Sequence, residues 1–442
     1  MSDGALLTDL YELNMAASYL RRGMLREATF SLFVRNLPPS RGFLVAAGLE
    51  PALEALEAFR FGDDDLAYLR DALGFDAAAL EAFRSLRFEG DVWAVPEGRV
   101  VLANEPLLEI TAPMPVAQLV EPLLLNLLTF QTTIASKAAR CVVAADGRDL
   151  VDFSLRRTQG LDAAMSVARV TALVGFVATS NVEAARRYGL TAAGTMAHSY
   201  IESFPSEAEA FRTFAEDRPD HTTFLVDTYD TLHGVRTAID VIRDLGLRGR
   251  LGIRLDSGDL ASLSRAARAL LDEADLREVR IFASGGLDET SIADLVAARA
   301  PIDAFGVGTR MGVSADAPYL DSAYKLVEYG GEPVVKLSAE KATFPGRKQV
   351  FRGPAGDVLG LRDEPAPAGS EPLLVPVMRG GRRVAPAGTL AEARGRFARD
   401  LAALPAAARA LRDPVAPVAR TSGALDDLTE RARTDALRRA GV

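Results

Sequence analysis

The stretch LGIRLDSGDL, residues 251–260, is the part of the chain that says most about the fold. Its first residues read as a β-strand whose side chains alternate between two faces, so Arg254 and Asp256 share one face and the apolar residues share the other. The Ser-Gly pair that follows predicts a turn, and Asp259 is expected to cap an amphipathic helix. A guanidinium and a carboxylate at the carboxyl end of a strand indicate a binding site. For these residues taken alone, a structural ion pair beside an ordinary helix cap is the alternative.

Composition limits the classes of protein to consider. The chain has 442 residues, 48% of them hydrophobic, enough for about two or three domains with a large core. Its net charge of −9 argues against a general nucleic-acid surface but leaves room for local basic pockets that bind small anionic metabolites. The single cysteine, Cys141, excludes an internal disulfide, and the N-terminus shows no signal peptide. The apolar stretch 119–135 contains charged and polar residues and is expected to be a buried helix, so we expect a cytoplasmic protein that binds neither membrane nor nucleic acid.

From about residue 150 to residue 308, short β-like runs alternate with helical runs. This pattern is typical of a parallel sheet covered by its crossover helices. An open sheet is one explanation, but so many successive units without a dinucleotide fingerprint favour closure into an α/β barrel. The expected strands are 150–154, 176–179, 192–195, 223–227, 251–255, 279–283 and 304–307, and the helices between them include 182–188, 232–245, 260–273 and 288–298.

The residues before and after the expected barrel form two further parts of the chain. Residues 1–127 mix helical segments with β-like ones, which predicts a separate N-terminal α/β domain. The barrel domain is expected over residues 128–330. Residues 331–442 are expected to form a C-terminal hairpin and a Pro- and Ala-rich tail with two short helical segments, part of which joins the N-terminal domain.

Polar residues follow the ends of the expected strands. Because the parallel strands of a barrel open on one mouth, these residues should converge there, where the active sites of such barrels lie. Glycine-rich loops after the last strands suit a phosphate group, although Gly285 is equally explained as a plain turn residue. The candidates in chain order are Arg156, Arg157, residues 179–181, Thr195, His198, Asp227, Arg254, Asp256, Ser284, Gly285 and Thr309.

His198 is the one histidine of three that stands just after an expected strand. Its ring could serve as a nucleophile or general base, whereas a lone histidine is more often a satisfied structural residue. The histidines supply no metal triad, so a divalent ion would be Mg²⁺ carried on substrate phosphates near Asp227 and Asp256. No lysine lies at an expected strand end, which disfavours Schiff-base chemistry.

Eight short motifs are spread over nearly the whole chain. They are TDLYELNM (8–15), NEPLL (104–108), SKAAR (136–140), FSLRRTQG (153–160), TSN (179–181), GTMAHS (194–199), RLDSGD (254–259) and KATFPGRKQ (341–349). Together, and in this order, they resemble the nicotinate phosphoribosyltransferase family. The resemblance implies a sandwich-like N-terminal α/β domain and an irregular, TIM-like α/β barrel of the type II phosphoribosyltransferase kind.

The resemblance also implies a reaction. The ribosyl group of 5-phosphoribosyl 1-diphosphate is transferred to the ring nitrogen of nicotinate, which yields nicotinate mononucleotide and diphosphate for NAD synthesis. ATP is a co-substrate whose hydrolysis is coupled to this transfer through a phosphohistidine, with Mg²⁺ as the metal. A homodimer is implied as well, in which the N-terminal region of one subunit approaches the site of its neighbour.

The positions that match the family's motifs imply some of the individual roles, and the chemistry of ribosyl transfer suggests the others. His198 matches the phosphorylated position, and Asp227 and Asp256 are expected to stabilise the sugar or position Mg²⁺. Arg157 or Arg254 would pair with the nicotinate carboxylate. The residues expected to bind substrate are Tyr11, Thr195 and Arg254 for nicotinate, Thr309 for the phosphoribosyl group, and Arg157, Ser284 and Gly285 as further contacts.

Two other functions remain open from the sequence. A related enzyme of the same fold group would use nicotinamide or quinolinate as the acceptor, because selectivity depends on pocket geometry. A catalytically inactive barrel that binds phosphorylated metabolites as a sensor is the alternative from a different class, and the retained Tyr11, His198, Arg254 and Asp256 argue against it.

Overall fold

The structure is a computed structural model that describes residues 4–337 and 343–441, so the start of the motif at 341–349 lies outside the described residues. The chain forms two compact units. The first comprises the chain up to Ser136 and again from Tyr319 onward, and the second comprises Lys137–Pro318. The sequence had suggested divisions after residues 127 and 330. Helix α6 (Glu121–Ala145) runs from the first unit into the second.

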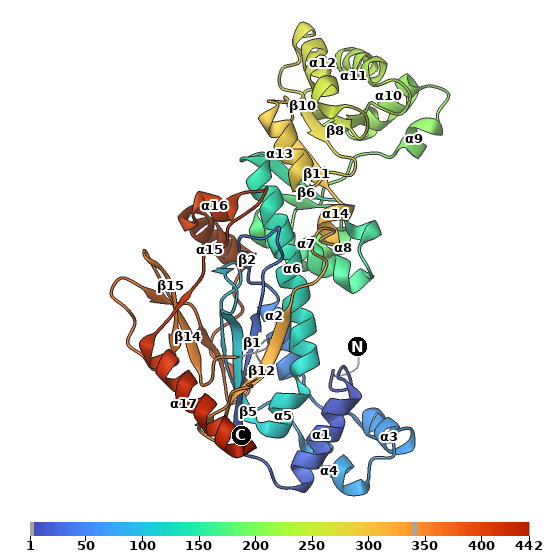
Figure 1. Cartoon of the computed structure of the whole chain (residues 1–442). Helices are drawn as coiled ribbons and strands as arrows, with labels where there is room; N and C mark the ends of the chain where they lie inside the picture. Colours follow the sequence, from blue (N-terminus) through green and yellow to red (C-terminus); the bar gives the residue numbers. More distant parts are fainter. Residues whose placement is uncertain (1–3, 338–342, 442) are drawn as a thin grey trace. The chain divides into compact units, whose positions relative to one another are not determined.

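The second unit contains a parallel sheet with the strand order β7-β6-β11-β10-β9-β8 (Figure 1). Every neighbouring pair in this order is parallel, so the chain winds around a curled sheet with helices on its outer side. The expected α/β fold with an irregular barrel is confirmed. The strands are β6 (Asp149–Asp152), β7 (Ala178–Thr179), β8 (His221–Leu225), β9 (Arg250–Leu255), β10 (Arg280–Ala283) and β11 (Ala304–Val307). The helices are η1 (Leu155–Arg157), α7 (Leu161–Val174), α8 (Val182–Tyr188), α9 (His198–Glu202), α10 (Glu207–Asp217), α11 (Thr231–Leu245), α12 (Leu260–Glu273), α13 (Glu289–Ala297) and α14 (Thr309–Gly312).

The strand expected at residues 192–195 is wrong in extent. It is reduced to a single parallel bridge between Thr179 and Ala192. Within the part of the chain that the structure describes, no ladder joins this segment to β8, so the curled sheet is open there. The segment AAGT lacks the apolar alternation of a half-buried strand, and Gly194 weakens strand pairing further.

Strand β9 has the alternation that the sequence predicted. The side chain of Arg254 is 11% exposed on one face, while the residues of the other face are buried under α11 and α12. Asp259 is the N-cap of α12, since its carboxylate accepts hydrogen bonds from two backbone N–H groups of the first turn. The buried residues of β9 on that face are Leu251, Ile253 and Leu255.

The first unit is built on an antiparallel sheet with the order β13-β12-β1-β5-β3-β17-β18. The aromatic rings of Phe30 and Tyr324 stack inside it with their centres 4.7 Å apart, which joins the N-terminal part of the chain to the segment after the barrel. The strands of this unit are β1 (Glu27–Val34), β2 (Leu44–Val45), β3 (Asp91–Ala94), β4 (Val100–Val101), β5 (Pro106–Pro113), β12 (Ser322–Tyr329), β13 (Glu332–Pro333), β14 (Lys348–Gly353), β15 (Gly356–Leu361), β16 (Glu371–Pro372), β17 (Val375–Arg379), β18 (Arg382–Arg383) and β19 (Arg420–Thr421).

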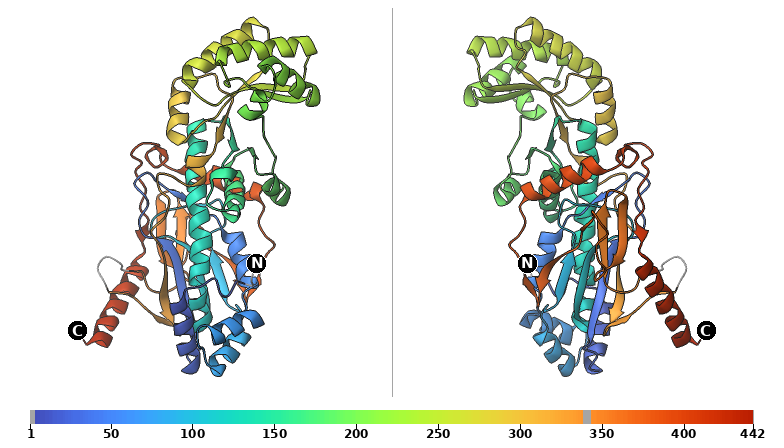
Figure 2. Two further views of the ribbon diagram at one scale, coloured as in Figure 1. Left: turned by 90° about the vertical axis from the view of Figure 1, so that its right-hand side faces the viewer. Right: turned by 90° about the vertical axis from the view of Figure 1, so that its left-hand side faces the viewer.

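The C-terminal tail has more regular structure than the two short helical segments that the sequence predicted. It adds a smaller sheet with the order β16-β14-β15-β19, and α17 packs beside β15 (Figure 2). The helices of the first unit are α1 (Leu10–Arg21), α2 (Leu49–Glu57), α3 (Asp63–Asp71), α4 (Ala77–Ser85), α5 (Met114–Leu119), α15 (Leu390–Ala403), α16 (Ala406–Arg409) and α17 (Gly423–Ala440).

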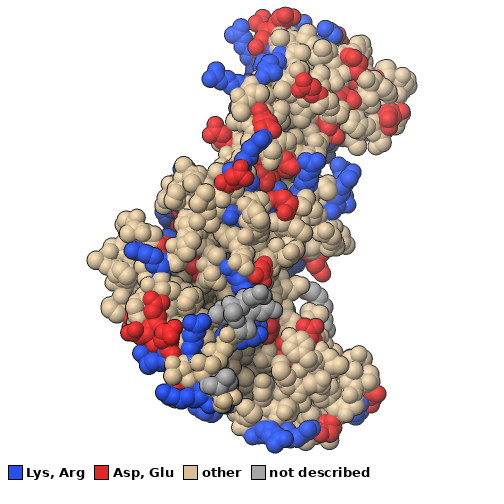
Figure 3. Space-filling view, viewed as in Figure 1, with Lys and Arg blue, Asp and Glu red and all other residues tan. Residues whose placement is uncertain are grey.

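The apolar stretch 119–135 is helical, as expected: it includes the end of α5 and the whole first half of α6. Among the described residues, no helix is both long and apolar enough to span a bilayer. Cys141 lies on the same helix as a buried free thiol, and burial raises its pKa, which disfavours the thiolate form. On the face seen in Figure 3, basic and acidic side chains are interspersed and neither sign forms a continuous surface.

Candidate active site

Arg254 connects residues from three segments at the carboxyl ends of the parallel strands. Its Nη2 donates to Oδ1 of Asp256 at 2.6 Å, and its Nε donates to Oγ of Ser284 at 2.8 Å. Its Nη1 donates to Oγ1 of Thr195 at 3.0 Å and to the carbonyl of Met196 at 3.4 Å. A guanidinium has about five N–H donors, so these bonds fix its orientation and leave one N–H of Nη2 for a ligand.

Asp256 is the carboxylate partner of this guanidinium. Ser284 donates from Oγ to the same Oδ1 at 2.5 Å, which closes a triangle of Arg254, Asp256 and Ser284. Burial acts to raise the pKa of Asp256, but the Ser284 hydrogen bond and the Arg254 charge outweigh it and hold the pKa below its usual value of 3.8. Asp256 is therefore ionised at neutral pH, as the counterion of an arginine or a cation requires.

Asp227 follows β8 and joins the same site through the backbone. Its Oδ2 accepts hydrogen bonds from the backbone N–H of Asp256 at 2.9 Å and from the hydroxyl of Ser257 at 2.6 Å. Its Oδ1 is buried and has no hydrogen-bond partner in the described part of the chain. A buried carboxylate oxygen without a partner is costly, so this oxygen is available to a ligand.

His198 is the first residue of α9 and faces Asp256. Its Nε2 lies 3.9 Å from Oδ2 of Asp256, and its side chain is 40% exposed. Its Nδ1 lies 3.1 Å from Oγ1 of Thr228, which holds the ring from the other side. Thr228 was not among the residues expected at this site. Its position directly after Asp227 was the one signal that could have singled it out.

Gly285 brings the end of β10 against the chain at Asp256. Its φ is +95°, and an added Cβ would lie 1.9 Å from the carbonyl oxygen of Asp256. A glycine is therefore required here by the packing of two backbones. This requirement explains Gly285 without a ligand, and its expected contact with substrate stays a prediction.

Comparison with known proteins identifies the family to which this chain belongs. Residues 6–129 match the nicotinate phosphoribosyltransferase (NAPRTase) N-terminal domain, and residues 149–350 match the nicotinate phosphoribosyltransferase family. The chain belongs to the nicotinate phosphoribosyltransferase family.

Two similar sequences and one solved structure show how far the likeness to other members extends. Nicotinate phosphoribosyltransferase pncB2 of Mycobacterium tuberculosis is 51% identical over 417 residues, which cover 93% of this chain and 89% of that protein. Nicotinate phosphoribosyltransferase of Bacillus subtilis is 45% identical over 376 residues, which cover 81% of this chain and 76% of that protein. The crystal structure of human nicotinic acid phosphoribosyltransferase superposes with a TM-score of 0.83 at 30% identity and covers 96% of this chain and 99% of that chain.

In this member of the nicotinate phosphoribosyltransferase family, a pocket of about 340 Å³ lies beside Arg254. The guanidinium carbon of Arg254 lies 5.5 Å from the centre of the Phe153 ring, within range for a cation–π interaction. An aromatic wall next to a fixed guanidinium can bind a flat anion, with its ring against Phe153 and its charge toward the arginine. The lining residues are Phe153, Leu155, Arg156, Ser180, Gly194, Thr195, Met196, Ala197 and Arg254.

Two neighbouring arginines differ in their relation to this pocket. Both are exposed, but Arg156 lines the pocket and Arg157 is not among the lining residues. Both belong to η1, in which successive side chains point about 120° apart, because a 3₁₀ helix has 3.0 residues per turn. The sequence placed both arginines after an expected strand but assigned a substrate contact to Arg157 alone, and it gave Phe153 no role. The substrate contact of Arg157 stays a prediction.

Thr309 and Tyr11 complete the set of expected binding residues. Thr309 is the first residue of α14, directly after β11, so it stands at the carboxyl end of the sheet with an exposed side chain. Tyr11 belongs to the first unit, on α1, where it is 53% exposed. The roles assigned to both residues stay predictions.

The residues of the site fit a Mg²⁺ ion that arrives with a phosphorylated substrate. Among the described residues, no group of three or more His, Cys, Asp and Glu side chains is arranged to hold a metal. Asp227, with its unpartnered Oδ1, and Asp256 supply two carboxylates. Mg²⁺ is commonly bound by one or two carboxylates together with substrate phosphates and water.

Proposed function

We propose that this protein transfers the phosphoribosyl group of 5-phosphoribosyl 1-diphosphate to the ring nitrogen of nicotinate, for NAD biosynthesis. The products are nicotinate mononucleotide and diphosphate. The observation that carries the proposal is the fixed Arg254 beside an aromatic wall and an ionised Asp256, at the carboxyl end of the sheet in a member of this family.

The geometry supports a division of roles. The bond between the ribose C1 and the diphosphate oxygen breaks, diphosphate leaves with the electron pair, and the nicotinate nitrogen uses its lone pair to form the new bond to C1. The remaining N–H of Arg254 would bind the nicotinate carboxylate, which directs the ring nitrogen away from the guanidinium. Asp256 and Asp227 place negative charge close to the positive character that develops on the ribose.

A Mg²⁺ ion on the diphosphate would neutralise the charge of the leaving group. Asp227 and Asp256 are the residues that would hold it, and the free Oδ1 of Asp227 supports this assignment.

His198 is the residue that we assign to ATP coupling. The hydrogen bond between Nδ1 and Thr228 leaves Nε2 as the ring nitrogen that can accept the γ-phosphoryl group of ATP, with ADP as the leaving group. The side chain is 40% exposed, so a nucleotide can reach it without unfolding of the site.

A homodimer with shared sites is the quaternary structure that we propose. The start of the first unit exposes three large apolar side chains, with Leu7 62%, Leu10 50% and Tyr11 53% exposed, which is the character of an interface rather than of a free surface. If Tyr11 completes the site of the neighbouring subunit, mixing the inactive variants Tyr11→Ala and Arg254→Ala under exchange conditions restores activity, because mixed dimers contain one intact site. Light scattering checks that dimers form, and no recovery in mixed dimers would remove the shared site.

We also propose a cytoplasmic location, which the free thiol of Cys141 supports.

The reaction is tested by incubating the protein with Mg²⁺, 5-phosphoribosyl 1-diphosphate and, separately, nicotinate, nicotinamide or quinolinate, each with and without ATP. Chromatography of the mononucleotides should show nicotinate mononucleotide as the main product, formed faster with ATP. A preference for another pyridine would reassign the acceptor. Ligand binding without any product would instead support a metabolite sensor.

A further inference from the structure

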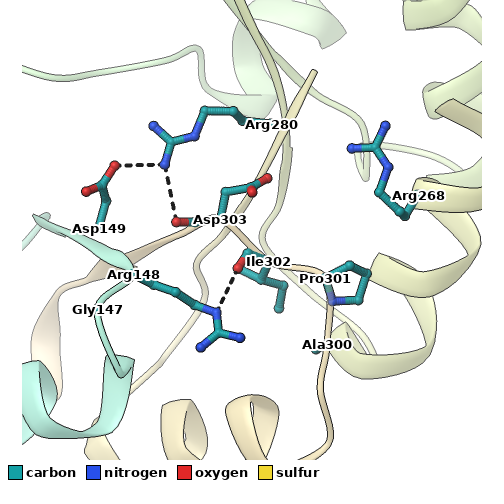
Figure 4. A pocket seen from close by; sticks show the side chains of 9 residues that line it. All are labelled: Gly147, Arg148, Asp149, Arg268, Arg280, Ala300, Pro301, Ile302 and Asp303. Atoms are coloured by element: carbon teal, nitrogen blue, oxygen red, sulfur yellow. Dashed lines mark hydrogen bonds and ion pairs between the residues drawn. The ribbon is translucent and has the colours of Figure 1, made fainter. Parts of the chain in front are cut away.

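A second pocket lies at the opposite end of the same parallel sheet. Its wall comes from the amino ends of three strands, since Asp149 begins β6, Arg280 begins β10 and Asp303 immediately precedes β11. Asp227 and Ser284, by contrast, follow the carboxyl ends of their strands. The pocket is open and has a volume of about 430 Å³. Its lining residues, shown in Figure 4, are Gly147, Arg148, Asp149, Arg268, Arg280, Ala300, Pro301, Ile302 and Asp303.

Two of its arginines are oriented by the protein but only partly used by it. Arg148 donates from Nε to the carbonyl of Ile302 at 3.1 Å and from Nη1 to the carbonyl of Ala145 at 3.4 Å. Arg280 donates from Nη2 to Asp149 at 2.7 Å and to the carbonyl of residue 303 at 3.2 Å. Since each guanidinium has about five N–H donors, more than half of the donors of these two arginines have no partner among the described residues.

The third arginine, Arg268, reaches the pocket from α12. Its Nε donates to Asp272 at 2.8 Å, and its two terminal nitrogens donate to the carbonyls of residues 279 and 276 at 2.8 and 2.9 Å. The Arg268 side chain is only 20% exposed, and these hydrogen bonds fix its position. Each terminal nitrogen keeps one further N–H for a ligand.

The hydrogen-bonding groups of the wall favour an anion. Its three guanidinium groups are accompanied by three carboxylates, those of Asp149, Asp303 and Asp272, and each of these carboxylates already has a partner. Asp149 accepts from Arg280, and Oδ2 of Asp303 accepts from the backbone N–H of Ile281 at 2.7 Å. The spare donors are therefore on cations whose forked geometry matches the oxygens of a phosphate.

We propose that this pocket binds a phosphate group, either as the free ion or as part of a small phosphorylated metabolite. Arg280 and Ser284 are four residues apart on one strand, which corresponds to roughly 13 Å. A phosphate here is thus a second ligand, distinct from substrate at the carboxyl end. The inference does not depend on the proposed reaction.

The test is isothermal titration of the full-length protein with inorganic phosphate and, separately, with glycerol 3-phosphate. Arg148→Gln and Arg280→Gln should each weaken binding by about tenfold, because each removes a charge-assisted contact. Asp303→Asn should change affinity in the opposite direction and tighten binding by about threefold, since it removes a negative charge and keeps an oxygen that can accept from Ile281. Arg236→Gln, an exposed arginine on α11, is the matched control and should leave affinity unchanged.

Circular dichroism and thermal unfolding establish that each variant is folded. Phosphate bound at the catalytic end would persist in the Arg148→Gln and Arg280→Gln variants, so the number of sites separates the two locations. Tighter binding of inorganic phosphate identifies the free ion as the ligand, and tighter binding of the ester identifies a metabolite. The same affinity and stoichiometry in wild type and both arginine variants, or weaker binding by Asp303→Asn, would overturn the proposal.

Discussion

Replacing Gly285 by alanine is the most local way to disturb the pair of Arg254 and Asp256. The new methyl group would lie 1.9 Å from the carbonyl oxygen of Asp256, where real contacts of this kind are not found below 3.0 Å. The two backbones must therefore separate by about 1 Å. A misplacement of that size near reacting groups costs roughly a hundredfold in rate. We expect Gly285→Ala to lose about this factor in kcat/KM for nicotinate mononucleotide formation.

Gly286 provides the matched control. Its φ of +67° lies in the left-handed region, and an added Cβ there would meet no atom within 4 Å. Gly286→Ala should carry only the backbone strain of about 1–2 kcal/mol in the free energy of unfolding and keep nearly full activity. Gly285→Ala carries comparable or greater backbone strain, since its φ of +95° lies further from the centre of that region. It also carries the clash with the carbonyl oxygen of Asp256. Urea unfolding and steady-state kinetics of both variants test this, and equal losses of activity would refute the role of the close contact.

Three further predictions concern charge. Arg254→Ala should lose on the order of 2.7–4 kcal/mol of transition-state stabilisation, about a hundredfold or more in kcat/KM, and a rate near that of the wild type would contradict its assignment. His198→Ala should keep ATP-independent transfer while losing stimulation by ATP, which product formation with and without ATP measures, and unchanged stimulation would remove its role. Burial, together with the charge of Glu12, raises the pKa of Glu121 from 4.5 to about 7, so the folded state holds a proton that the unfolded state has lost, and stability falls as the pH rises through this window. Glu121→Gln should then stabilise the protein by about 1–2 kcal/mol at pH 8, allowing for partial exposure. Below pH 4.5, where the carboxyl group is protonated in the folded and the unfolded state, the substitution should have no effect. Urea unfolding at pH 8 and at a pH below 4.5 measures both outcomes.

Much of the barrel was predictable because its signals are local. The alternation of β9 and the cap at Asp259 depend on residues next to one another in the chain. The positions of Asp227, Arg254 and Ser284 at one end of the sheet follow from the rule that parallel strands share a direction. The strand expected at 192–195 was wrong in extent because its small residues and Gly194 supply little to stabilise a ladder.

Other features depended on distances between segments that are far apart in the chain. Which of Arg156 and Arg157 lines the pocket was decided by the turn geometry of η1. The contact of Thr228 with His198 depended on how β8 and α9 meet.

The sequence by itself therefore determined the family, most of the order of strands and helices in the barrel, and the end of the sheet at which the polar residues gather. Only the tertiary structure decided which of those residues touch, why Gly285 must be glycine, and that three arginines form a second pocket at the amino end. The physical reason is that periodicity and capping act over a few residues, whereas the approach of side chains from separate strands is set by sheet register, curvature and packing.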